Sequence, residues 1–382
     1  MHLCFLCNEY PPAPHGGIGS FTQTLARELV KHGHSASVVG LYPIDSPATE
    51  DDQGVSVIRV PQGRIPKLRI AANFFRMQQA LKRLHRERPI DLLEGADRSF
   101  FLVSPRLPIP KLLRMHGGYV ATLMHLGQVP ERQKVLEDRW AVRVATHLCA
   151  CSRFVAEANR KRLALGDRPI RVILNPVDLR LFRPQDPALE EDGLIVCVGT
   201  IIERKGIRQL VEAMPQVIAA YPRARLIAYG NDSVDSRTGE SFAEKLRRSI
   251  PPGLSDRITL AGPVRREQLP ALMAKASVCI YPSHVEALPI AWVEGLAMGK
   301  AVIGARIGPG PEVIEDGVSG LLCDPHDPNS IAAALLTLLR DPALRTRLGA
   351  AGRARAEQLF SLEKLVHENI AFYRECASGP GT

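Results

Sequence analysis

Two glutamates, Glu286 and Glu294, are separated by seven residues in the segment YPSHVEALPIAWVEGLAMGKAVIGA at 281–305. Pro289 is typical of a first helical turn, which predicts Glu286 in the preceding loop and Glu294 inside an otherwise apolar helix. A carboxylate in apolar surroundings is costly unless another group donates hydrogen bonds to it. The two hydroxyls of a ribose would meet that need, and a bond to a neighbouring strand is the structural alternative. The loop amides at 287–289 are expected to meet a sugar or a phosphate.

Arg204 and Lys205 lie in VGTIIERKGIRQLVEA at 198–213, just beyond a predicted strand and at the start of a predicted helix. Two cations beside the free amides of a helix N-terminus suit a pyrophosphate. A solvated pair of surface charges is the alternative interpretation.

A glycine-rich segment, HGGIGSF at 15–21, follows the first predicted strand, and a helix is expected to open around Ser20. Glycine lets the backbone approach an anion, and a helix N-terminus adds amide donors. The spacing is not G-x-G-x-x-G, because Thr22 stands where the last glycine would fall. No acidic residue ends the second strand, SVVGLY, where a nicotinamide ribose would need one. We therefore expect no dinucleotide site, and a tight turn without a ligand is the alternative.

Short apolar runs that alternate with helical patterns must position these residues. A segment rich in proline and charge at 175–193 separates two such series and is the predicted linker. This alternation predicts an α/β fold with two Rossmann-like, parallel-sheet domains that face each other across a cleft. The predicted strands are 3–7, 36–41, 55–60, 90–94, 111–115, 146–151, 170–174, 194–199, 225–229, 257–261, 277–281 and 300–304, and 329–375 is predicted to be almost wholly helical.

Length and composition describe a folded, mildly basic protein. The 382 residues favour two or three domains, and 49 Lys plus Arg against 40 Asp plus Glu give a formal charge of +9. Hydrophobic residues at 45% and charged residues at 23% exclude a disordered or collagen-like chain. Every stretch long enough to span a membrane contains charge, so no spanning helix is expected. Aromatic residues at 5%, without a known motif, argue against nucleic acid as a partner.

The eight cysteines are expected to be reduced thiols of the core. Cys4 and Cys7 lie in one predicted strand and Cys149 and Cys151 in another, whereas a zinc site needs such pairs on turns. The N-terminus, MHLCFLCNEYPP, has no basic region before its short apolar run, so a signal peptide is not expected. Reduced thiols and no leader favour the cytoplasm.

These motifs, in this order and over nearly the whole chain, resemble those of the retaining glycosyltransferases of family four, which have the GT-B fold. HGG at 116–118 resembles the strand-end histidine motif of that family, and NPVD at 175–178 resembles its hinge. Glu286 and Glu294 match its Glu-x7-Glu pair. The other matches are PP…GGIG with the amino-terminal glycine loop, KHGHSASVV at 31–39, KG at 205–206 with the phosphate lysine, and GPGPEVIEDGVSGLL at 308–322.

The resemblance implies a role for each matching residue. Lys205 would neutralise the pyrophosphate of the donor, Glu294 would bind the nucleotide ribose, and Glu286 would position the transferred sugar. His116 would face the sugar from the first domain and stabilise the reacting centre, so the implied catalytic residues are Glu286 and His116. The implied donor-binding residues are Gly16, Gly17, Arg204, Lys205, Ala287, Leu288, Pro289 and Glu294.

The resemblance also implies an acceptor-side domain over 1–180 and a domain for the nucleotide sugar over 190–360, with a C-terminal helix over 361–377 that packs back on the first. One position departs from the family pattern, because Thr200 stands where an arginine usually follows the glycine of VG. Either Arg204 supplies that charge, or phosphate binding is weaker or the donor differs. No D-x-D sequence occurs, so we expect no carboxylate-held metal and no cofactor beyond the co-substrate.

The implied activity is retaining transfer of a hexose from a nucleotide-diphosphate sugar to a carbohydrate or lipid-linked acceptor, in the synthesis of cell-surface polysaccharide or glycolipid. A UDP-sugar is favoured by family prevalence. A nucleotide-sugar epimerase of the same architecture and a non-catalytic nucleotide-sugar-binding protein are the alternatives. The basic segment at 67–88 has apolar residues at helical spacing, which suits contact with an anionic membrane; a plain surface helix is the alternative. The implied location is the cytoplasm, at the inner membrane face.

Overall fold

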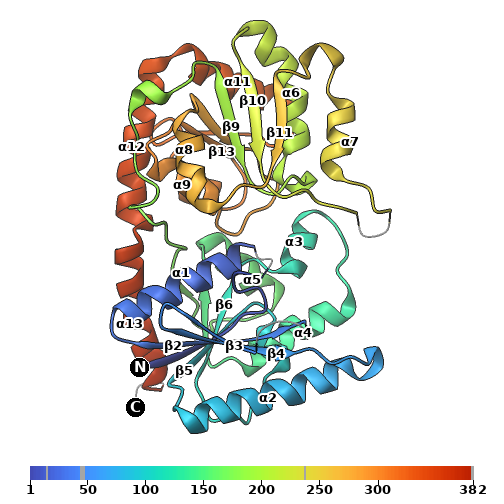
Figure 1. Cartoon of the computed structure of the whole chain (residues 1–382), viewed down its shortest axis with the longest axis vertical. Coiled ribbons are helices and arrows are strands. Elements are labelled where there is room, and N and C mark those ends of the chain that lie inside the picture. Colours follow the sequence, from blue (N-terminus) through green and yellow to red (C-terminus); the bar gives the residue numbers. More distant parts are fainter. Residues whose placement is uncertain (14–15, 44–47, 236–237, 380–382) are drawn as a thin grey trace. The chain divides into compact units, whose positions relative to one another are not determined.

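The computed structural model describes residues 1–13, 16–43, 48–235 and 238–379, so His15, the first residue of the glycine motif, lies outside the described residues. The chain forms two compact units (Figure 1). Unit 1 comprises Met1–Asn175 and Glu363–Thr382, and unit 2 comprises Pro176–Leu362. Each unit has a mainly parallel sheet with helices packed against it, which confirms the predicted α/β fold class.

The sheet of unit 1 has the strand order β3-β4-β2-β1-β5-β6-β7-β8, and only the β3–β4 pair is antiparallel. Its strands are β1 His2–Leu6, β2 Ser35–Tyr42, β3 Thr49–Asp52, β4 Val55–Pro61, β5 Leu92–Ala96, β6 Lys111–Met115, β7 His147–Ala150 and β8 Arg171–Val172. Its helices are α1 Gly17–Lys31, α2 Arg69–Glu87, α3 Tyr119–His125, α4 Arg132–Val144, α5 Arg153–Arg162 and α13 Leu362–Ala377, with short 3-10 helices η1 Pro66–Leu68 and η2 Ser99–Leu102.

The sheet of unit 2 has the order β11-β10-β9-β12-β13-β14 and is parallel throughout. Its strands are β9 Leu194–Val198, β10 Arg225–Tyr229, β11 Ile258–Gly262, β12 Val278–Tyr281, β13 Val302–Ala305 and β14 Leu321–Cys323. Its helices are α6 Ile207–Ala220, α7 Phe242–Ser249, α8 Leu269–Ala274, α9 Ile290–Ala297, α10 Gly310–Val313, α11 Pro328–Arg340 and α12 Pro342–Phe360, with η3 Pro187–Leu189, η4 Glu203–Lys205, η5 Pro252–Leu254 and η6 Arg266–Gln268.

Every strand predicted from the sequence overlaps an observed strand, but β3 and β14 were not predicted. The sequence of β3, TEDD, is polar because this strand pairs only with β4, at the sheet edge. A two-residue turn joins the two strands, and its residues Gln53 and Gly54 both have positive φ, as a hairpin turn requires. The segment 329–375 is helical as predicted, with breaks at Asp341 and Ser361.

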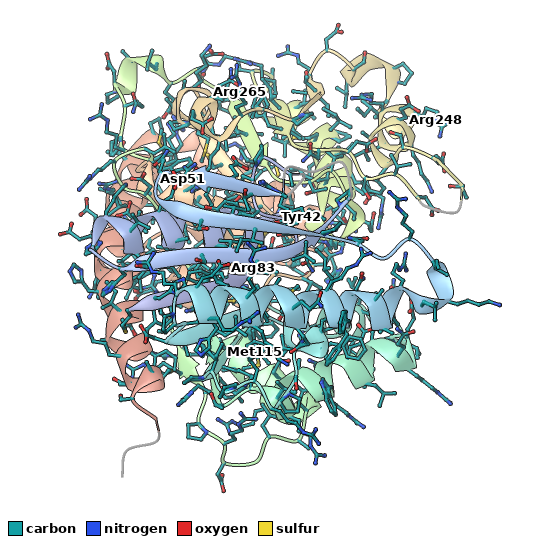
Figure 2. The ribbon with its side chains drawn as sticks, turned by 60° about the horizontal axis from the view of Figure 1, so that its bottom comes forward. Tyr42, Asp51, Arg83, Met115, Arg248 and Arg265 are labelled. Carbon is teal, nitrogen blue, oxygen red and sulfur yellow. The ribbon has the colours of Figure 1, made fainter. Side chains whose placement is uncertain are left out.

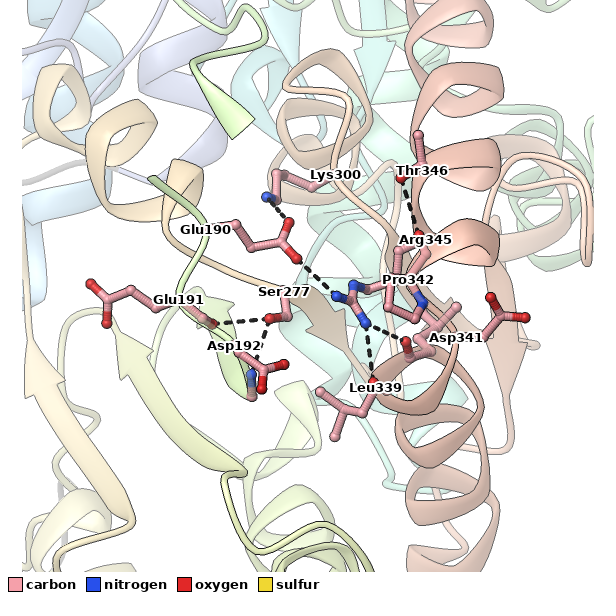
Figure 3. Close-up of polar contacts among 12 residues, drawn as sticks. Glu190, Glu191, Asp192, Ser277, Lys300, Leu339, Asp341, Pro342, Arg345 and Thr346 are labelled. Atoms are coloured by element: carbon pink, nitrogen blue, oxygen red, sulfur yellow. Dashed lines mark hydrogen bonds and ion pairs between the residues drawn. The ribbon is translucent and has the colours of Figure 1, made fainter. Parts of the chain in front are cut away.

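The predicted linker is bound to unit 2 along its second half (Figure 3). The Glu190 carboxylate accepts hydrogen bonds from Lys300 Nζ at 3.0 Å and from Arg345 Nη2 at 3.1 Å. Ser277 Oγ, at the start of β12, donates to the carbonyl oxygen of Glu191. These bonds join the linker to three separate parts of unit 2, so this stretch is a fixed part of the unit.

A buried guanidinium holds the C-terminal helix α13 on the sheet of unit 1. Arg114, on β6, has no exposed surface, and its Nε lies 2.6 Å from Oε1 of Glu94 on β5. Its Nη2 donates to Asn369 Oδ1 at 2.6 Å and to the Tyr373 hydroxyl at 3.3 Å, both on α13. The guanidinium also lies 5.1 Å from the centre of the Phe21 ring on α1. A single buried charge therefore joins two strands and two helices.

We expect Asn369→Ala to destabilise the protein by about 1.5–3 kcal/mol, because a buried hydrogen bond to a charged group is lost. Urea unfolding should show this as a lower midpoint, while the exposed Glu375→Ala, on the same helix, should leave the midpoint unchanged. Equal midpoints for Asn369→Ala and the wild type would show that Arg114 does not hold α13.

Candidate functional site

The carboxyl ends of β9 and β12 lie side by side at the centre of the unit 2 sheet. The chain runs from β9 outward to β10 and β11, and β12 then returns to the other side of β9. In open parallel sheets, ligands bind in the crevice where the strand order reverses in this way. The loops after these two strands hold the candidate residues Thr200, Arg204, Lys205 and Glu286.

Lys205 and Glu286 form an ion pair across this crevice. Lys205 is the last residue of η4, and Glu286 lies in the loop between β12 and α9. The His284 amide donates to the Arg204 carbonyl at 2.9 Å and joins the two loops. Gly206 lets them approach, since a Cβ at this position would lie 1.8 Å from the Pro282 carbonyl oxygen. The sequence predicted both charged residues but did not predict that they pair.

Thr200 lies at the start of the first loop, directly after β9. Its neighbours tie this segment to β10, because the Gly199 amide donates to the Tyr229 carbonyl and the Ile201 amide donates to the Asn231 carbonyl. Arg204 and Lys205 follow in η4, so the cations of this loop lie one turn beyond the position where the resemblance led us to expect an arginine.

Glu294 is buried inside α9, as predicted, and its side chain is 6% exposed. The hydrogen-bond donor to it is Arg266, in η6 after β11, whose Nη2 and Nε lie 3.0 and 3.3 Å from Glu294 Oε1. Burial raises the pKa of Glu294, and the charge of Arg266 opposes that shift. The Arg266 guanidinium in turn lies 5.5 Å from the centre of the Phe182 ring. Sequence reasoning missed Arg266, although a double arginine directly after a strand was the available signal.

Residues 287–289 connect Glu286 to helix α9, which contains Glu294. Leu288 is buried, and the Pro289 carbonyl accepts hydrogen bonds from the Trp292 and Val293 amides at the start of α9. Proline has no amide hydrogen, so Pro289 cannot donate to a sugar or a phosphate, and the expectation of three loop amides was wrong at this position.

In unit 1, His116 follows β6 and is held from two sides. Its amide donates to Asp97 Oδ1 at 2.9 Å, and its ring packs edge-on against Phe21 with 5.0 Å between centroids. Burial and the nearby Arg114 charge lower the pKa of His116 to about 3. The imidazole is therefore neutral at physiological pH.

Gly16 and Gly17 lie at the start of α1, which begins three residues before the predicted Ser20. The Glu9 carboxylate already occupies this helix N-terminus, because its Oε1 accepts hydrogen bonds from the amides of Gly16 at 3.3 Å and Gly19 at 2.8 Å. The chain thus provides its own anion here, and sequence reasoning missed it. A second anion at these amides would meet the negative charge of Glu9.

No group of three or more His, Cys, Asp or Glu side chains in the described part of the chain is arranged to hold a metal ion. The eight cysteines are buried free thiols, spread over both units. Gly16, Gly17 and His116 belong to unit 1, and the other candidate residues belong to unit 2.

Two family models match consecutive parts of the chain. The model described as "Glycosyltransferase Family 4" matches residues 15–181, and "Glycosyl transferases group 1" matches residues 180–355. A D-inositol 3-phosphate glycosyltransferase of Nocardiopsis dassonvillei is 28% identical over 95% of this chain and 90% of its own. A GDP-mannose-dependent alpha-(1-6)-phosphatidylinositol monomannoside mannosyltransferase of Mycolicibacterium smegmatis is 27% identical over 92% of each chain. The structure of sucrose-phosphate synthase from Thermosynechococcus elongatus has the same fold, with a TM-score of 0.85, 23% identity and 99% of each chain covered.

We expect Arg266→Met to destabilise the protein by about 1–3 kcal/mol at pH 7, because Glu294 would remain buried without its donor. The pKa of Glu294 is already raised, so its ionised form disfavours the folded state, and losing Arg266 raises the pKa further. The stability deficit should therefore shrink as the pH falls and Glu294 takes up a proton.

Urea unfolding at several pH values measures this deficit. Arg257→Met is the matched control, because Arg257 is an exposed arginine at the other end of β11. Adding Glu294→Gln to Arg266→Met should restore part of the lost stability. A deficit that does not change with pH would contradict the pairing.

Proposed function

The chain belongs to glycosyltransferase family 4, and from this premise we propose that it transfers a hexose from a nucleotide-diphosphate sugar to a hydroxyl of a carbohydrate or lipid-linked acceptor, with retention of configuration. A UDP-sugar is the proposed donor, because this nucleotide prevails in the family. The pairing of Lys205 with Glu286 at the switch point of the unit 2 sheet is the observation that carries the proposal. It brings a cation for phosphate and a carboxylate for sugar hydroxyls to one place.

The proposed donor site uses two of the ion pairs of unit 2, Lys205–Glu286 and Arg266–Glu294. Both Arg266 contacts go to one oxygen of Glu294, which leaves the other oxygen to accept from ribose hydroxyls. Lys205 would exchange Glu286 for the diphosphate, and Glu286 would then accept from hydroxyls of the transferred sugar. The pair is partly open to solvent, with side chains 22% and 11% exposed, so a ligand can reach it.

Charge explains how these groups would speed the transfer. When the bond between the sugar and the diphosphate breaks, negative charge develops on the leaving phosphate and positive charge on the anomeric carbon. Lys205 and Arg204 would stabilise the leaving group because they are already in place. The neutral His116 would hydrogen-bond the sugar without adding positive charge beside the reacting carbon. Gly16 and Gly17 would approach the donor or the acceptor through the backbone.

The proposed reaction needs no metal ion and no cofactor besides the nucleotide sugar. The cations of η4 would do the work that a carboxylate-held Mg²⁺ does in other phosphate sites. Transfer should therefore persist in EDTA.

We expect Lys205→Met to lower sugar transfer about 100-fold or more, because a fixed charge at the leaving phosphate is lost. Glu286→Gln should lower transfer as well, with nucleotide affinity less affected. Arg208→Met is the control, since Arg208 is an exposed neighbour that pairs with Glu203 and Glu212. Full activity of both Lys205→Met and Glu286→Gln would contradict the proposed site.

A thermal-shift screen with UDP, GDP, ADP and their sugars, with and without magnesium, identifies the donor. A nucleotide at 100 times its Kd adds about 2.7 kcal/mol of stability. Conversion of the nucleotide sugar into another one without an acceptor would indicate an epimerase. Binding without turnover on a broad acceptor panel would indicate a non-catalytic protein, with Thr200 as the first residue to examine.

We also propose that unit 1 contacts an anionic membrane at the cytoplasmic face through the segment 67–88. The described part of the chain has no helix that meets the length and hydropathy needed to cross a bilayer, so contact would be peripheral. Leu68, Ile70 and Phe75 are at least half exposed at the start of α2, and the first acidic residue of the helix is Glu87.

Helix α4 extends this surface in a way that the sequence did not reveal. Both α2 and α4 pack on η2, and they lie alongside each other in Figures 1 and 2, where Figure 2 labels Arg83 on α2. Leu136 and Trp140 are exposed on α4, whereas its two acidic residues, Glu137 and Asp138, are buried. The exposed acids Glu87 and Glu131 lie at the ends of these helices, and the exposed apolar side chains between them lie among cations, which suits an anionic lipid surface.

We expect the protein to float with vesicles of phosphatidylcholine and phosphatidylglycerol, but not with phosphatidylcholine alone, and to be released by high salt. Phe75→Ser combined with Trp140→Ser should abolish flotation. Val318→Ser is the control, because Val318 is an exposed apolar residue of unit 2. If both variants still float, the proposed surface is contradicted. If the wild type is a dimer and only the double variant is not, the partner of this surface is a second copy of the chain.

A further inference from the structure

The sheet of unit 1 has a switch point of its own, between β1 and β5. The chain runs from β1 outward to β2, and β5 then lies on the other side of β1. The residues that follow these strands therefore flank a crevice of the kind that binds ligands in open parallel sheets. The glycine segment follows β1, and Asp97 directly follows β5.

Asp97 has an uncommon backbone conformation and a well-defined position. Its φ of +45° lies in the left-handed region, which few residues other than glycine adopt and which is frequent at functional sites. Its amide donates to the Arg114 carbonyl at 3.0 Å, and its Oδ1 accepts from the His116 amide at 2.9 Å. Gly118 also has positive φ, and a Cβ there would lie 3.4 Å from the Asp97 carboxyl group. The loop after β6 thus closes around this carboxylate.

The neighbouring arginines are engaged with other carboxylates. Arg162 Nη1 lies 2.6 Å from Asp138 Oδ2, and Arg98 Nε lies 3.7 Å from Glu137 Oε2. Within the described ranges, Asp97 takes part in no ion pair of its own. The charges of Arg98 and Arg162 act on Asp97, but neither arginine forms an ion pair with it. One of its oxygens accepts from the His116 amide, so a hydroxyl or amide donor would suit the other oxygen.

We propose that Asp97 binds the acceptor: its carboxylate accepts a hydrogen bond from a hydroxyl of the sugar or polyol that receives the transferred hexose. This inference rests on the proposed function and extends it to unit 1. Asp97 follows the strand beside β1 as Glu286 follows the strand beside β9, so each sheet would present one carboxylate to substrate hydroxyls. The loop after β1, on the other side of this switch point, carries the Glu9 carboxylate at the N-terminus of α1, and this second negative charge favours a neutral polyol over a phosphate.

The test is Asp97→Asn, because asparagine tolerates the left-handed conformation and keeps an oxygen for the His116 amide. Asp91→Asn is the matched control. Asp91 stands at the opposite end of β5, and its Oδ2 accepts from the His2 amide at 2.7 Å. We measure transfer from UDP-glucose and GDP-mannose to methyl and octyl glucosides, hydrolysis of the donor without acceptor, and calorimetric binding of nucleotide and glucoside.

We expect Asp97→Asn to lower kcat/KM for the glucoside about 10- to 100-fold, the effect of a lost charged hydrogen bond. Donor hydrolysis and nucleotide affinity should stay within twofold of the wild type, and Asp91→Asn should match the wild type throughout. An equal loss of transfer and hydrolysis would overturn the proposal, since Asp97 would then support the reacting centre rather than the acceptor.

The pH profile gives a readout that a structural role would not change. Burial raises the pKa of Asp97 to about 6, with Asp138 adding to the shift and Arg98 and Arg162 opposing it. Cys151, also facing Asp97, stays protonated, because burial raises the pKa of this thiol. Wild-type transfer should therefore fall below about pH 6 as Asp97 takes up a proton, and Asp97→Asn should lack this fall. If transfer by Asp97→Asn falls below about pH 6 as it does in the wild type, the proposal is overturned.

Glucoside binding separates the two proposals if no donor is turned over. Absence of turnover would contradict the proposed function alone. Glucoside that binds the wild type and Asp91→Asn but not Asp97→Asn would still support the acceptor site. Equal binding to all three proteins, or no binding to the wild type, would overturn it.

Discussion

A charged side chain that is buried away from water needs a partner of opposite charge or a hydrogen-bonding group, and this constraint shapes both units. The Arg114–Glu94 pair is closed to solvent and joins strands β5 and β6, and through Asn369 it also holds α13. The Lys205–Glu286 pair satisfies the same constraint but is partly exposed. A closed pair can only stabilise a fold, because no ligand reaches it. An open pair between two loops can exchange one partner for a ligand of the same charge, so Lys205–Glu286 is compatible with the proposed site and Arg114–Glu94 is not.

The two sheets have the same arrangement of strands around a switch point but different side chains beside it. In each unit a central strand is followed by a loop that leads into a helix, and the strand beyond the switch point is followed by a carboxylate. Unit 2 places cations opposite Glu286, which suits a diphosphate. Unit 1 places Glu9 at the corresponding helix N-terminus, where its negative charge would repel a diphosphate. In the proposed sites, strand order would thus determine where a ligand binds, and the side chains of the first loop would determine which kind of ligand it is.

Sequence periodicity predicted the strands well because parallel strands covered on both faces are continuous apolar runs. It missed β3, whose register comes from a hairpin turn and whose four residues, TEDD, contain no apolar side chain. The predicted residues Glu286 and Glu294 carry their signal in a local pattern, so they were identifiable. Glu9 had no such pattern, and the double arginine that contains Arg266 did not reveal its partner, because the contacts of Arg266 with Glu294 and of Glu9 with Gly16 depend on how loops turn after a strand. Such contacts have no period, and only the folded chain brings them together.

Proline and charge predicted a linker over 175–193, and the boundary between the units falls at its start, between Asn175 and Pro176. Its contacts were not predicted: Phe182 is buried beneath Arg266, and Glu190 is bound by Lys300 and Arg345. The chain passes between the units twice, near residue 175 and near residue 362. Val177 links the two passages through backbone hydrogen bonds. Its amide donates to the Phe360 carbonyl, and its carbonyl accepts from the Leu362 amide.

The two connections are therefore hydrogen-bonded to each other. Since Phe182 lies a few residues beyond Val177 and contacts Arg266, the segment that joins the units also supports the partner of Glu294. A ligand that draws Glu294 away from Arg266 would thus act on a residue packed against the linker, and this contact is a physical route from the candidate ribose site to the connection between the units.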